Sequence, residues 1–549
     1  MKSTTFRRGA ALAAALTMAA MPAAYADDSK VLDRLDRLEH RIDSLESDVK
    51  DRDAKIQTLE DQVKDRDAKI QNLQDGQAAA ATSAAQIQPA AGQPAMGQPA
   101  DAQRLDNLER TVKQLNEVTN AQAEELAKPK GAKVTTKGGL KVESEDGQFS
   151  FQPIGRLHYD AAFYNQDKSK MGDGSQLRRA RLGMTGKMFS DWIYKLEVDF
   201  GRNTGSGTIG VKDAYISYLG WNPAQITVGN FKEPFSINNL TSTNYLSFIE
   251  RPLPITQPTT SLMPDRHMGI AASHYDSNWS ASVGTFMAHT DVTVPPNEGD
   301  QSFDVAARIT YDPILDKGRL VHIGLSGLYR NPSDSAVAFD LKPESNVTGV
   351  QFLKTDGTPT ALNPGALTAV DHLYDVDPEL ALTYGPVSFL GEYFWVPITQ
   401  HQHDSCPNPG GAAAANLRRC PDVTLTGWYA ELSYFLTGES RPYNPATARF
   451  DRLMPNHNLG KDGWGAFELA ARISHADFDD GPDFQKGTET NYTLGVNWYV
   501  NPYIRFIMDY VWVRNNASAA GNVANLLPGN ASAGYDDPSI LEMRAQVDW

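Results

Sequence analysis

The segment QLRRARLGMTGKM (Gln176–Met188) has two different faces when its residues are taken alternately, as they point in a β-strand. One face carries polar and charged side chains: Arg179, Arg181, Thr185 and Lys187. The other is apolar: Ala180, Leu182, Met184 and Met188. This alternation suits a soluble sheet that packs its apolar face inward. It equally suits a membrane barrel that turns its apolar face to lipid and its charges to an aqueous interior.

The same alternation recurs from about residue 134 to the end of the chain, in sixteen segments separated by Gly, Asn, Asp and Pro turns. The last segment, SILEMRAQVDW (Ser539–Trp549), alternates throughout and ends on an aromatic residue. An even number of alternating segments is typical of bacterial outer-membrane barrels. We therefore predict an all-β fold over residues 134–549, a sixteen-stranded antiparallel transmembrane β-barrel preceded by an N-terminal α-helical coiled coil.

The lengths of the connections favour the membrane barrel over a soluble sandwich. Segments meet through short turns such as FSD, GWNPA, DSN, GP and VNP at one end. At the other end the connections are long, at 232–266, 331–377, 401–422 and 515–538. Short periplasmic turns and long outer loops produce this parity. The connection 438–462 is an exception, because it is long where a short turn is expected.

The N-terminal quarter has a different composition. Residues 1–26 have basic residues, an apolar run too short to span a bilayer and an Ala-Tyr-Ala cleavage site, which predicts a secretory signal peptide. Residues 30–75 keep a heptad repeat and predict a coiled coil. A flexible Ala/Gln/Pro linker at 76–100 and a short helical segment at 101–130 follow. This order predicts an outer-membrane location with the coiled coil in the periplasm.

The chain has two cysteines, Cys406 and Cys420, which reach an oxidising compartment after export. We therefore expect a disulfide between them. His401 and His403 lie nearby, but they supply too few ligands to predict a metal site. Because no Ser-His-Asp spacing, nucleotide loop or metal cluster stands out, we expect no enzyme, no catalytic residue, no cofactor, no metal and no nucleic-acid partner.

The barrel interpretation places the charges of the alternating segments in the lumen, since Arg or Lys facing lipid at mid-bilayer costs about 2–4 kcal/mol. Arg179, Arg181 and Lys187 would then line one wall beside Arg156 of the first strand. Strict alternation puts Arg178 on the lipid side, from where it could snorkel to water or turn inward at a bulge. Two hypotheses stay open for the row: an electrostatic path for anions, or arginines that pair with facing carboxylates and stiffen the wall.

Several segments resemble the phosphate- and polyphosphate-selective porins of Gram-negative outer membranes (porin O/P type). They are KGGLKV, FSFQPIGRLHYD, LRRARLG with DWIYKLEVDF, NNLTSTNYLSFIER, ELSYFLTGESRPYN and YTLGVNWYVN. TGESRPYN lies in the long connection that breaks the parity, which makes that connection a family trait. The resemblance covers about residues 134–549 and implies a trimeric porin. It also implies loops folded into the lumen and a ladder of arginines that leads to a lysine-lined anion site.

The ladder is partly present in this sequence. Arg156, the pair Arg178 and Arg179, and Arg251 match its arginines, and Lys137 matches a basic residue at the periplasmic side.

Other positions depart from the family pattern. The central lysines align with Ile193, Thr227 and Asn239. An arginine-rich stretch of the fifth outer loop reads SAVAFDLKPES here, with Lys342 between Asp340 and Glu344. These departures put phosphate selectivity in doubt more than the channel itself.

We therefore expect a porin for passive diffusion of small hydrophilic solutes, anion-preferring, with phosphate or polyphosphate as candidate solutes. The expected partners are outer-membrane lipid, two further copies in a homotrimer, and small anions such as phosphate. The alternative is an envelope tether whose coiled coil links the barrel to peptidoglycan, with general non-selective diffusion as a secondary role.

Overall fold

The computed structural model describes residues 131–136, 139–201, 209–256, 265–287, 301–332, 337–355, 369–401, 405–406, 418–460, 463–481, 484–516 and 535–549, with the single positions 110, 113, 262, 335 and 367. The predicted signal peptide, coiled coil and linker lie outside these residues. The predicted helical segment at 101–130 does too, apart from positions 110 and 113. Within the described ranges, no helix has the length and apolar character needed to cross a bilayer.

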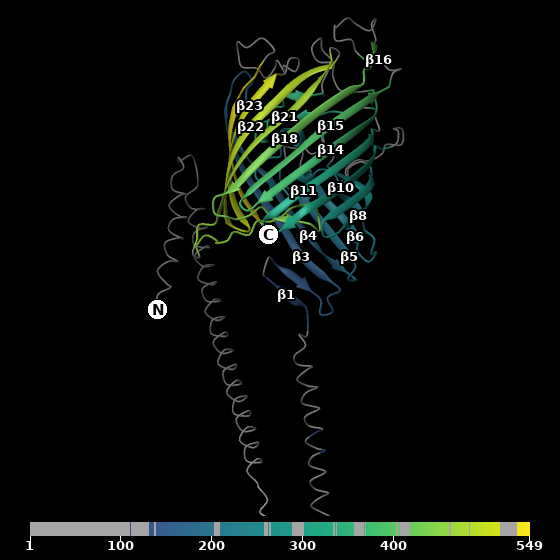
Figure 1. Ribbon diagram of the computed structural model, residues 1–549, viewed down its shortest axis with the longest axis vertical. Coiled ribbons are helices and arrows are strands. Elements are labelled where there is room, and N and C mark those ends of the chain that lie inside the picture. Colours follow the sequence, from purple (N-terminus) through teal and green to yellow (C-terminus); the bar gives the residue numbers. More distant parts are fainter. Residues whose placement is uncertain are drawn as a thin grey trace, which may run out of the picture. The chain divides into compact units, whose positions relative to one another are not determined.

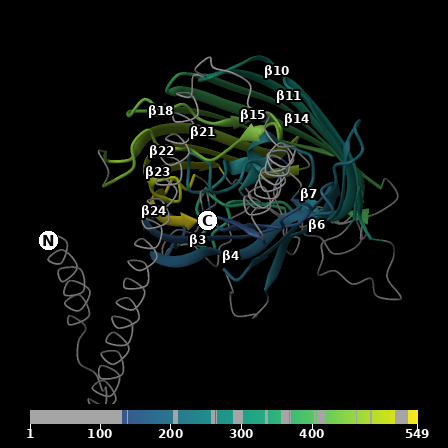
Figure 2. The same ribbon diagram turned by 90° about the horizontal axis from the view of Figure 1, so that it is seen from below.

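Figures 1 and 2 show the barrel from the side and from below. Sixteen antiparallel strands form the barrel, as the alternation predicts. They are β3 (Ser150–Asn165), β4 (Gly174–Met188), β5 (Trp192–Asp199), β6 (Gly210–Tyr218), β7 (Gln225–Lys232), β8 (Arg266–Tyr275), β9 (Trp279–Phe286), β10 (Phe303–Asp316), β11 (Arg319–Asn331), β14 (Val370–Tyr384), β15 (Val387–Gln400), β18 (Val423–Phe435), β21 (Ala466–Asp480), β22 (Phe484–Asn501), β23 (Ile504–Asn516) and β24 (Ser539–Asp548).

The remaining elements are short. A hairpin of β1 (Lys133–Thr135) and β2 (Lys141–Glu143) precedes the barrel and pairs with the start of β3. The connections contain the helix α4 (Ile237–Leu240), the 3-10 turn η1 (Leu253–Ile255) and three two-stranded ladders. These ladders are β12 (Asp340–Leu341) with β13 (Leu353–Lys354), β16 (Ser405–Cys406) with β17 (Arg418–Arg419), and β19 (Tyr443–Asn444) with β20 (Arg449–Phe450).

The first and last barrel strands pair with each other and close the sheet. The ladder runs from Ser539 opposite Asn165 to Asp548 opposite Arg156. Beyond it, the backbone groups of Trp549 and Gly155 exchange two hydrogen bonds of 3.2 and 3.1 Å. A Cβ at Gly155 would lie 2.2 Å from the Trp549 ring, so this position requires glycine. Closure satisfies the edge strands, which a barrel in lipid cannot leave unpaired.

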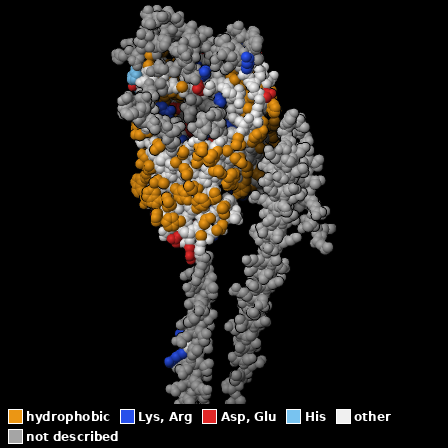
Figure 3. Space-filling view, turned by 180° about the vertical axis from the view of Figure 1, so that it is seen from behind, with side chains coloured by type: hydrophobic (Ala, Val, Ile, Leu, Met, Phe, Trp, Pro, Cys, Tyr) orange, Lys and Arg blue, Asp and Glu red, His pale blue; other side chains and the backbone are white. Residues whose placement is uncertain are grey.

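The distribution of side chains is inverted relative to a soluble protein. On β24, Glu542 and Arg544 are 0% and 2% exposed, whereas Met543 between them is 39% exposed. Large exposed apolar residues recur along the other barrel strands, and Figure 3 shows them as a broad orange band on the barrel wall. A soluble sandwich would bury these residues. The apolar face of the opening segment therefore faces outward and its charges face the lumen.

A β-bulge in β4 decides the direction of Arg178. The register pairs His158 with Arg179 and Tyr159 with Leu177, so Arg178 is an extra residue without a partner on β3. The bulge turns both arginines into the barrel, where they are 7% and 5% exposed. Of the two alternatives left by strict alternation, the inward turn is the one observed.

The connections follow the expected parity at one end of the barrel. Two-residue turns join β10 to β11 and β14 to β15, while residues 436–465 join β18 to β21 at the same end. At the other end most connections are long, although β21 and β22 are joined by residues 481–483 only. We assign the end with short turns to the periplasm.

One ion pair stabilises the closing seam, and its loss should be measurable. Arg544 lies opposite Asp160 and contacts both of its carboxylate oxygens at 2.7 Å, with both side chains 0% exposed. Removing one partner of a buried pair typically costs about 3–5 kcal/mol. We expect Arg544→Ala to lower the free energy of unfolding of the detergent-solubilised barrel by about that amount, measured by urea titration of tryptophan fluorescence.

Arg319→Ala is the matched control, because the side chains of its pair with Asp316 are 58% and 54% exposed. An exposed pair contributes about 0–1 kcal/mol. Equal destabilisation by the two substitutions would contradict the role of the seam pair.

Candidate functional site

The connection between β7 and β8, residues 233–265, folds into the barrel and is called here the inner loop. Most of its described side chains are buried, and Asn238 and Asn239 are 1% and 0% exposed. Hydrogen bonds attach it to the far wall, where Ser247 Oγ donates to Glu468 at 2.8 Å and the Ile249 N–H donates to Asp509 at 2.7 Å. The inner loop therefore narrows the lumen, as the family resemblance implies.

Glu250 of the inner loop accepts contacts from three arginines on the barrel wall. Arg178 donates to both carboxylate oxygens at 2.8 and 3.2 Å, Arg544 lies at 3.0 Å, and Arg179 lies at 3.6 Å. Burial alone would raise the pKa of Glu250, but the three guanidinium groups outweigh it and hold that pKa well below its usual range. Glu250 is therefore ionised and fastens the inner loop to β4 and β24.

The other arginines of the opening row are also paired. Arg181 contacts Glu197 at 2.8 Å and Asp199 at 2.7 Å. Arg156 contacts the same Glu197 at 3.1 Å and donates to Ser242 and Thr243 of the inner loop. Arg156, Arg179 and Arg181 of the predicted row thus lie in the lumen, and much of their charge is compensated by facing carboxylates.

The exceptional connection at residues 436–465 enters the barrel from the periplasmic end and meets the inner loop. Arg449 donates to the Leu240 carbonyl at 3.2 Å, and the Ala448 carbonyl accepts from Arg308 of β10 at 2.9 Å. Two connections from opposite ends of the barrel therefore touch at one level. The residues that make this contact, Ala448 and Arg449, follow TGESRPYN in the same connection.

A cavity of about 300 Å³ lies where these two connections meet the wall formed by β3 to β10. Its lining contains ten basic side chains: Arg156, Arg179, Arg181, Lys195, Lys212, Lys232, Arg251, Arg266, Arg308 and Arg449. The acidic side chains of the lining are Asp213, Glu250 and Asp265. The excess of positive charge makes this constriction attractive to anions.

Four of the basic side chains have no carboxylate within ion-pair distance among the described residues: Lys212, Lys232, Arg251 and Arg449. Arg251 instead donates to the carbonyl oxygens of Asn239 at 2.9 Å and Thr241 at 3.1 Å. Lys232 donates to the same Asn239 carbonyl. We call these four residues the free cations below, because none of them has a carboxylate at contact distance; Asp265 still acts on Lys212, Lys232 and Arg251 at longer range.

The alternating pattern did not reveal Lys212, because a second bulge reverses it. The register pairs Glu197 with Asp213 and Val198 with Val211, which leaves Lys212 as the extra residue of β6. Simple alternation with inward Asp213 would place Lys212 in lipid. A lysine in lipid costs about 2–4 kcal/mol, and this cost could have indicated from the sequence that the strand is irregular.

Of the three positions that the resemblance aligned with the family's central lysines, Thr227 and Asn239 lie on the cavity wall. Ile193 of β5 is half-buried outside it. Lys212 and Lys232 lie on the same wall, so lysines are present at the constriction although not at the aligned positions. The sequence alone could not show that Lys212 and Lys232 reach this wall.

The remaining predicted site residues lie elsewhere. Arg178 contacts Glu250 from behind the lining, Lys187 is exposed at the turn end of β4, and Lys342 is 5% exposed near Asn346 in the connection from β11 to β14. Lys137 lies outside the described residues. Cys420 is buried and disulfide-bonded, and its predicted pairing with Cys406 stays a prediction.

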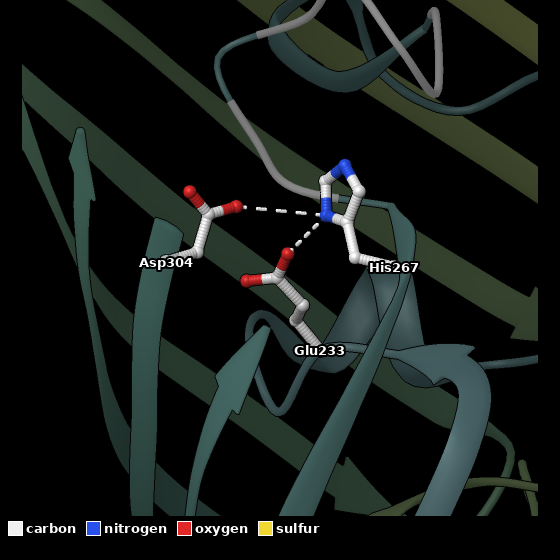
Figure 4. A group of neighbouring side chains, drawn as sticks. All are labelled: Glu233, His267 and Asp304. Atoms are coloured by element: carbon white, nitrogen blue, oxygen red, sulfur yellow. Dashed lines mark hydrogen bonds and ion pairs between the residues drawn. The ribbon is translucent and has the colours of Figure 1, made fainter. Parts of the chain in front are cut away.

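A separate group of polar side chains holds the start of the inner loop, as Figure 4 shows. His267 Nδ1 contacts Glu233 and lies 3.6 Å from Asp304, which in turn binds Arg330 at 2.6 Å. Burial and the neighbouring Asp304 raise the pKa of Glu233. Each member of the group has a partner in the protein, so we assign it to anchoring the loop.

The family model described as phosphate-selective porin O and P matches residues 151–549. Porin O of Pseudomonas aeruginosa is 26% identical over 411 residues, covering 71% of this chain and 88% of that protein. An uncharacterized protein of Caulobacter vibrioides is 26% identical over 399 residues, covering 70% of this chain and 72% of that protein.

Among solved structures, an anion-selective porin from Comamonas acidovorans has a TM-score of 0.44 at 12% identity, covering 73% of this chain and 100% of that one. The outer membrane channel DcaP of Acinetobacter baumannii has a TM-score of 0.42 at 12% identity, covering 74% and 99%. Because the family model matches the chain from the first barrel strand to the last residue, this protein belongs to the outer-membrane porin family described as phosphate-selective porin O and P.

Proposed function

We propose that this porin passes small anions by passive diffusion and selects them at the cavity where the inner loop meets the periplasmic connection. The observation that carries this proposal is the lining of ten basic and three acidic side chains around about 300 Å³. Within that lining, the free cations supply positive charge that no carboxylate of the described residues contacts directly. Rings of Lys and Arg are a recurrent basis of anion selectivity in pores.

The paired arginines have a different role in this proposal. Arg178, Arg181 and Arg544 hold the inner loop and the wall in place through Glu250, Glu197, Asp199 and Asp160. Their fields are largely compensated at short range, so they define the shape of the constriction more than its charge. The two hypotheses for the arginine row, an anion path and a rigid wall, therefore apply to different residues.

Phosphate is the anion class that we propose as the preferred solute. Besides the free cations, the lining offers neutral donors at Thr227, Asn239, Ser242 and Thr243. Lysine ammonium groups and hydroxyl or amide donors can together replace part of the hydration of a phosphate group. The family description points the same way.

We further propose that the protein functions without catalysis as a homotrimer in outer-membrane lipid, with its N-terminal coiled coil in the periplasm. Family membership supports the channel role and the outer-membrane location. A tether to peptidoglycan through residues 30–75 concerns a part of the chain outside the described residues.

The free lysines should control ion selectivity. In planar bilayers with a salt gradient, we expect Lys212→Gln with Lys232→Gln to lower the anion-to-cation permeability ratio by about tenfold, since focused charge in a cleft changes local ion concentration by at least that order. Titrated phosphate should also block the chloride current less strongly in this variant than in the wild type.

Lys187→Gln removes a single positive charge at an exposed position outside the cavity lining and should leave the permeability ratio unchanged. An unchanged reversal potential in the double variant would refute the proposed filter. A changed reversal potential without any phosphate block in the wild type would refute only the preference for phosphate.

Glu250 should stabilise the barrel without supplying selectivity. We expect Glu250→Gln to lower the free energy of unfolding by about 3–5 kcal/mol, because three arginines lose a buried partner. The permeability ratio should remain in favour of anions, since the substitution removes a negative charge from the lining.

The difference in the free energy of unfolding between the wild type and Glu250→Gln should depend on pH in a definite direction. The pKa of Glu250 is lowered in the folded state, so its stabilisation is complete above the unfolded value of about 4.3. It is lost as the pH falls from there through the folded pKa. Urea titrations should thus give a constant difference between wild type and variant from pH 7 to pH 5.5 and a shrinking one below about pH 4. A difference that vanishes by pH 5.5 would exclude an ionised Glu250.

A further inference from the structure

The inner face of β14 and β15 carries a group of buried carboxylates that the anion path does not use. Asp375, Asp377 and Glu379 alternate along β14 and are 1%, 0% and 3% exposed. Glu392 of β15 is 4% exposed and lies directly opposite Glu379 in the register. Like charges directly opposite each other destabilise a sheet, so this arrangement needs compensation.

The carboxylates lie close enough to share one ligand. An oxygen atom from each of Asp377, Glu379 and Glu392 lies within 4.8 Å of the other two. The three residues come from adjacent, hydrogen-bonded strands, so the barrel itself sets their spacing. Asp375 lies two residues before Asp377 on the same face and adds a further negative charge.

The hydrogen bonds around the group leave part of it uncompensated. Glu379 binds Arg308 at 2.6 Å and His322 at 3.1 Å, and Glu392 accepts from the Tyr429 hydroxyl. Among the described residues, no N–H group and no hydroxyl donates to either oxygen of Asp377, whose near neighbour is the Glu392 carboxyl, and Asp375 likewise has no donor.

Arg330 acts on Asp375 only electrostatically, since its close contact is with Asp304. Four buried carboxylates therefore face one arginine and one histidine at contact distance. Burying an unpaired carboxylate costs several kcal/mol.

We propose that Asp377, Glu379 and Glu392 bind a calcium ion. All donors are carboxylate oxygens, which suit a hard cation and not the nitrogen and sulfur preference of zinc. Asp377 can offer both oxygens, and Ca²⁺ tolerates the irregular, partly bidentate coordination that these three side chains provide, whereas Mg²⁺ demands near-octahedral geometry. The ion would be taken up as the barrel folds, because the ligands are buried in the finished structure.

The proposed calcium site contacts the inner loop but does not line the cavity that selects anions. The Ile237 N–H of the inner loop donates to Glu379 at 2.7 Å and to Glu392 at 2.9 Å. Arg308 lies between the two regions, since it lines the cavity and binds Glu379. A cation that fixes these carboxylates also fixes the inner loop, on which Asn239 and Arg251 stand.

The binding test uses the full chain purified in detergent, treated with EDTA and dialysed. Calcium content after re-equilibration is measured by mass spectrometry, and Tb³⁺ luminescence is excited through tyrosine, because Tyr429 contacts Glu392. We expect one calcium ion per chain in the wild type. Asp377→Asn should bind at least about tenfold more weakly, and Asp371→Asn should bind like the wild type, because Asp371 lies on the same strand with its side chain 45% exposed.

The free energy of unfolding in urea is a second measurement, which remains informative when a variant binds no metal. In EDTA, Asp377→Asn and Glu392→Gln should each be more stable than the wild type, since each relieves repulsion between carboxylates. In calcium the order should reverse.

A free energy of unfolding of the wild type that is identical in EDTA and in calcium would overturn the proposal. This result is expected if Asp377 and Glu392 share a proton and bind no ion. Calcium binding that Asp377→Asn leaves unchanged would also overturn it, because the ion would then lie elsewhere.

Discussion

The contact between Glu250 and three arginines is the interaction on which the channel depends. Arg178 and Arg179 stand on β4 and Arg544 stands on β24, the strands on either side of β3 at the closing seam. One carboxylate from the inner loop thus fastens that loop to the place where the barrel closes. With water largely excluded, each of these contacts is stronger than on a surface, and each unpaired member would be costly.

Pairing divides the basic residues of the lumen into two populations. Those that contact carboxylates hold the wall and the inner loop, and those without a carboxylate at contact distance keep more of their charge available to a solute. Lys212, Lys232, Arg251 and Arg449 form the second population. On the far side of Arg308 the balance reverses, and the carboxylates of β14 and β15 outnumber their cations. The inner loop lies between a basic and an acidic region and makes hydrogen bonds to both.

Prediction from the pattern worked where the physical rule is strictly periodic. Sixteen strands, their lumen and lipid faces, and a last strand at Ser539–Trp549 follow from alternation with a period of two. The same pattern left the direction of Arg178 open and did not place Lys212 in the lumen. At both positions a bulge adds one residue and shifts the side-chain direction without changing the composition of the strand. The resemblance to the family pointed to Thr227 and Asn239, which line the cavity, but it could not show that Lys212 and Lys232 reach the same wall.

The order of polar and apolar residues alone specifies a barrel with a charged lumen, because every side chain in lipid must be apolar and every strand edge must be paired. Which charges are cancelled and which remain available depends on contacts between residues far apart in the chain, such as Glu250 with Arg544 and Arg449 with the Leu240 carbonyl. Those contacts exist only after the inner loop and the connection at 436–465 have folded into the closed barrel. The sequence therefore determines how many charges this channel carries. Which charges pair with one another is determined only by the folded structure, since electrostatic compensation acts over a few ångströms in space and not along the sequence.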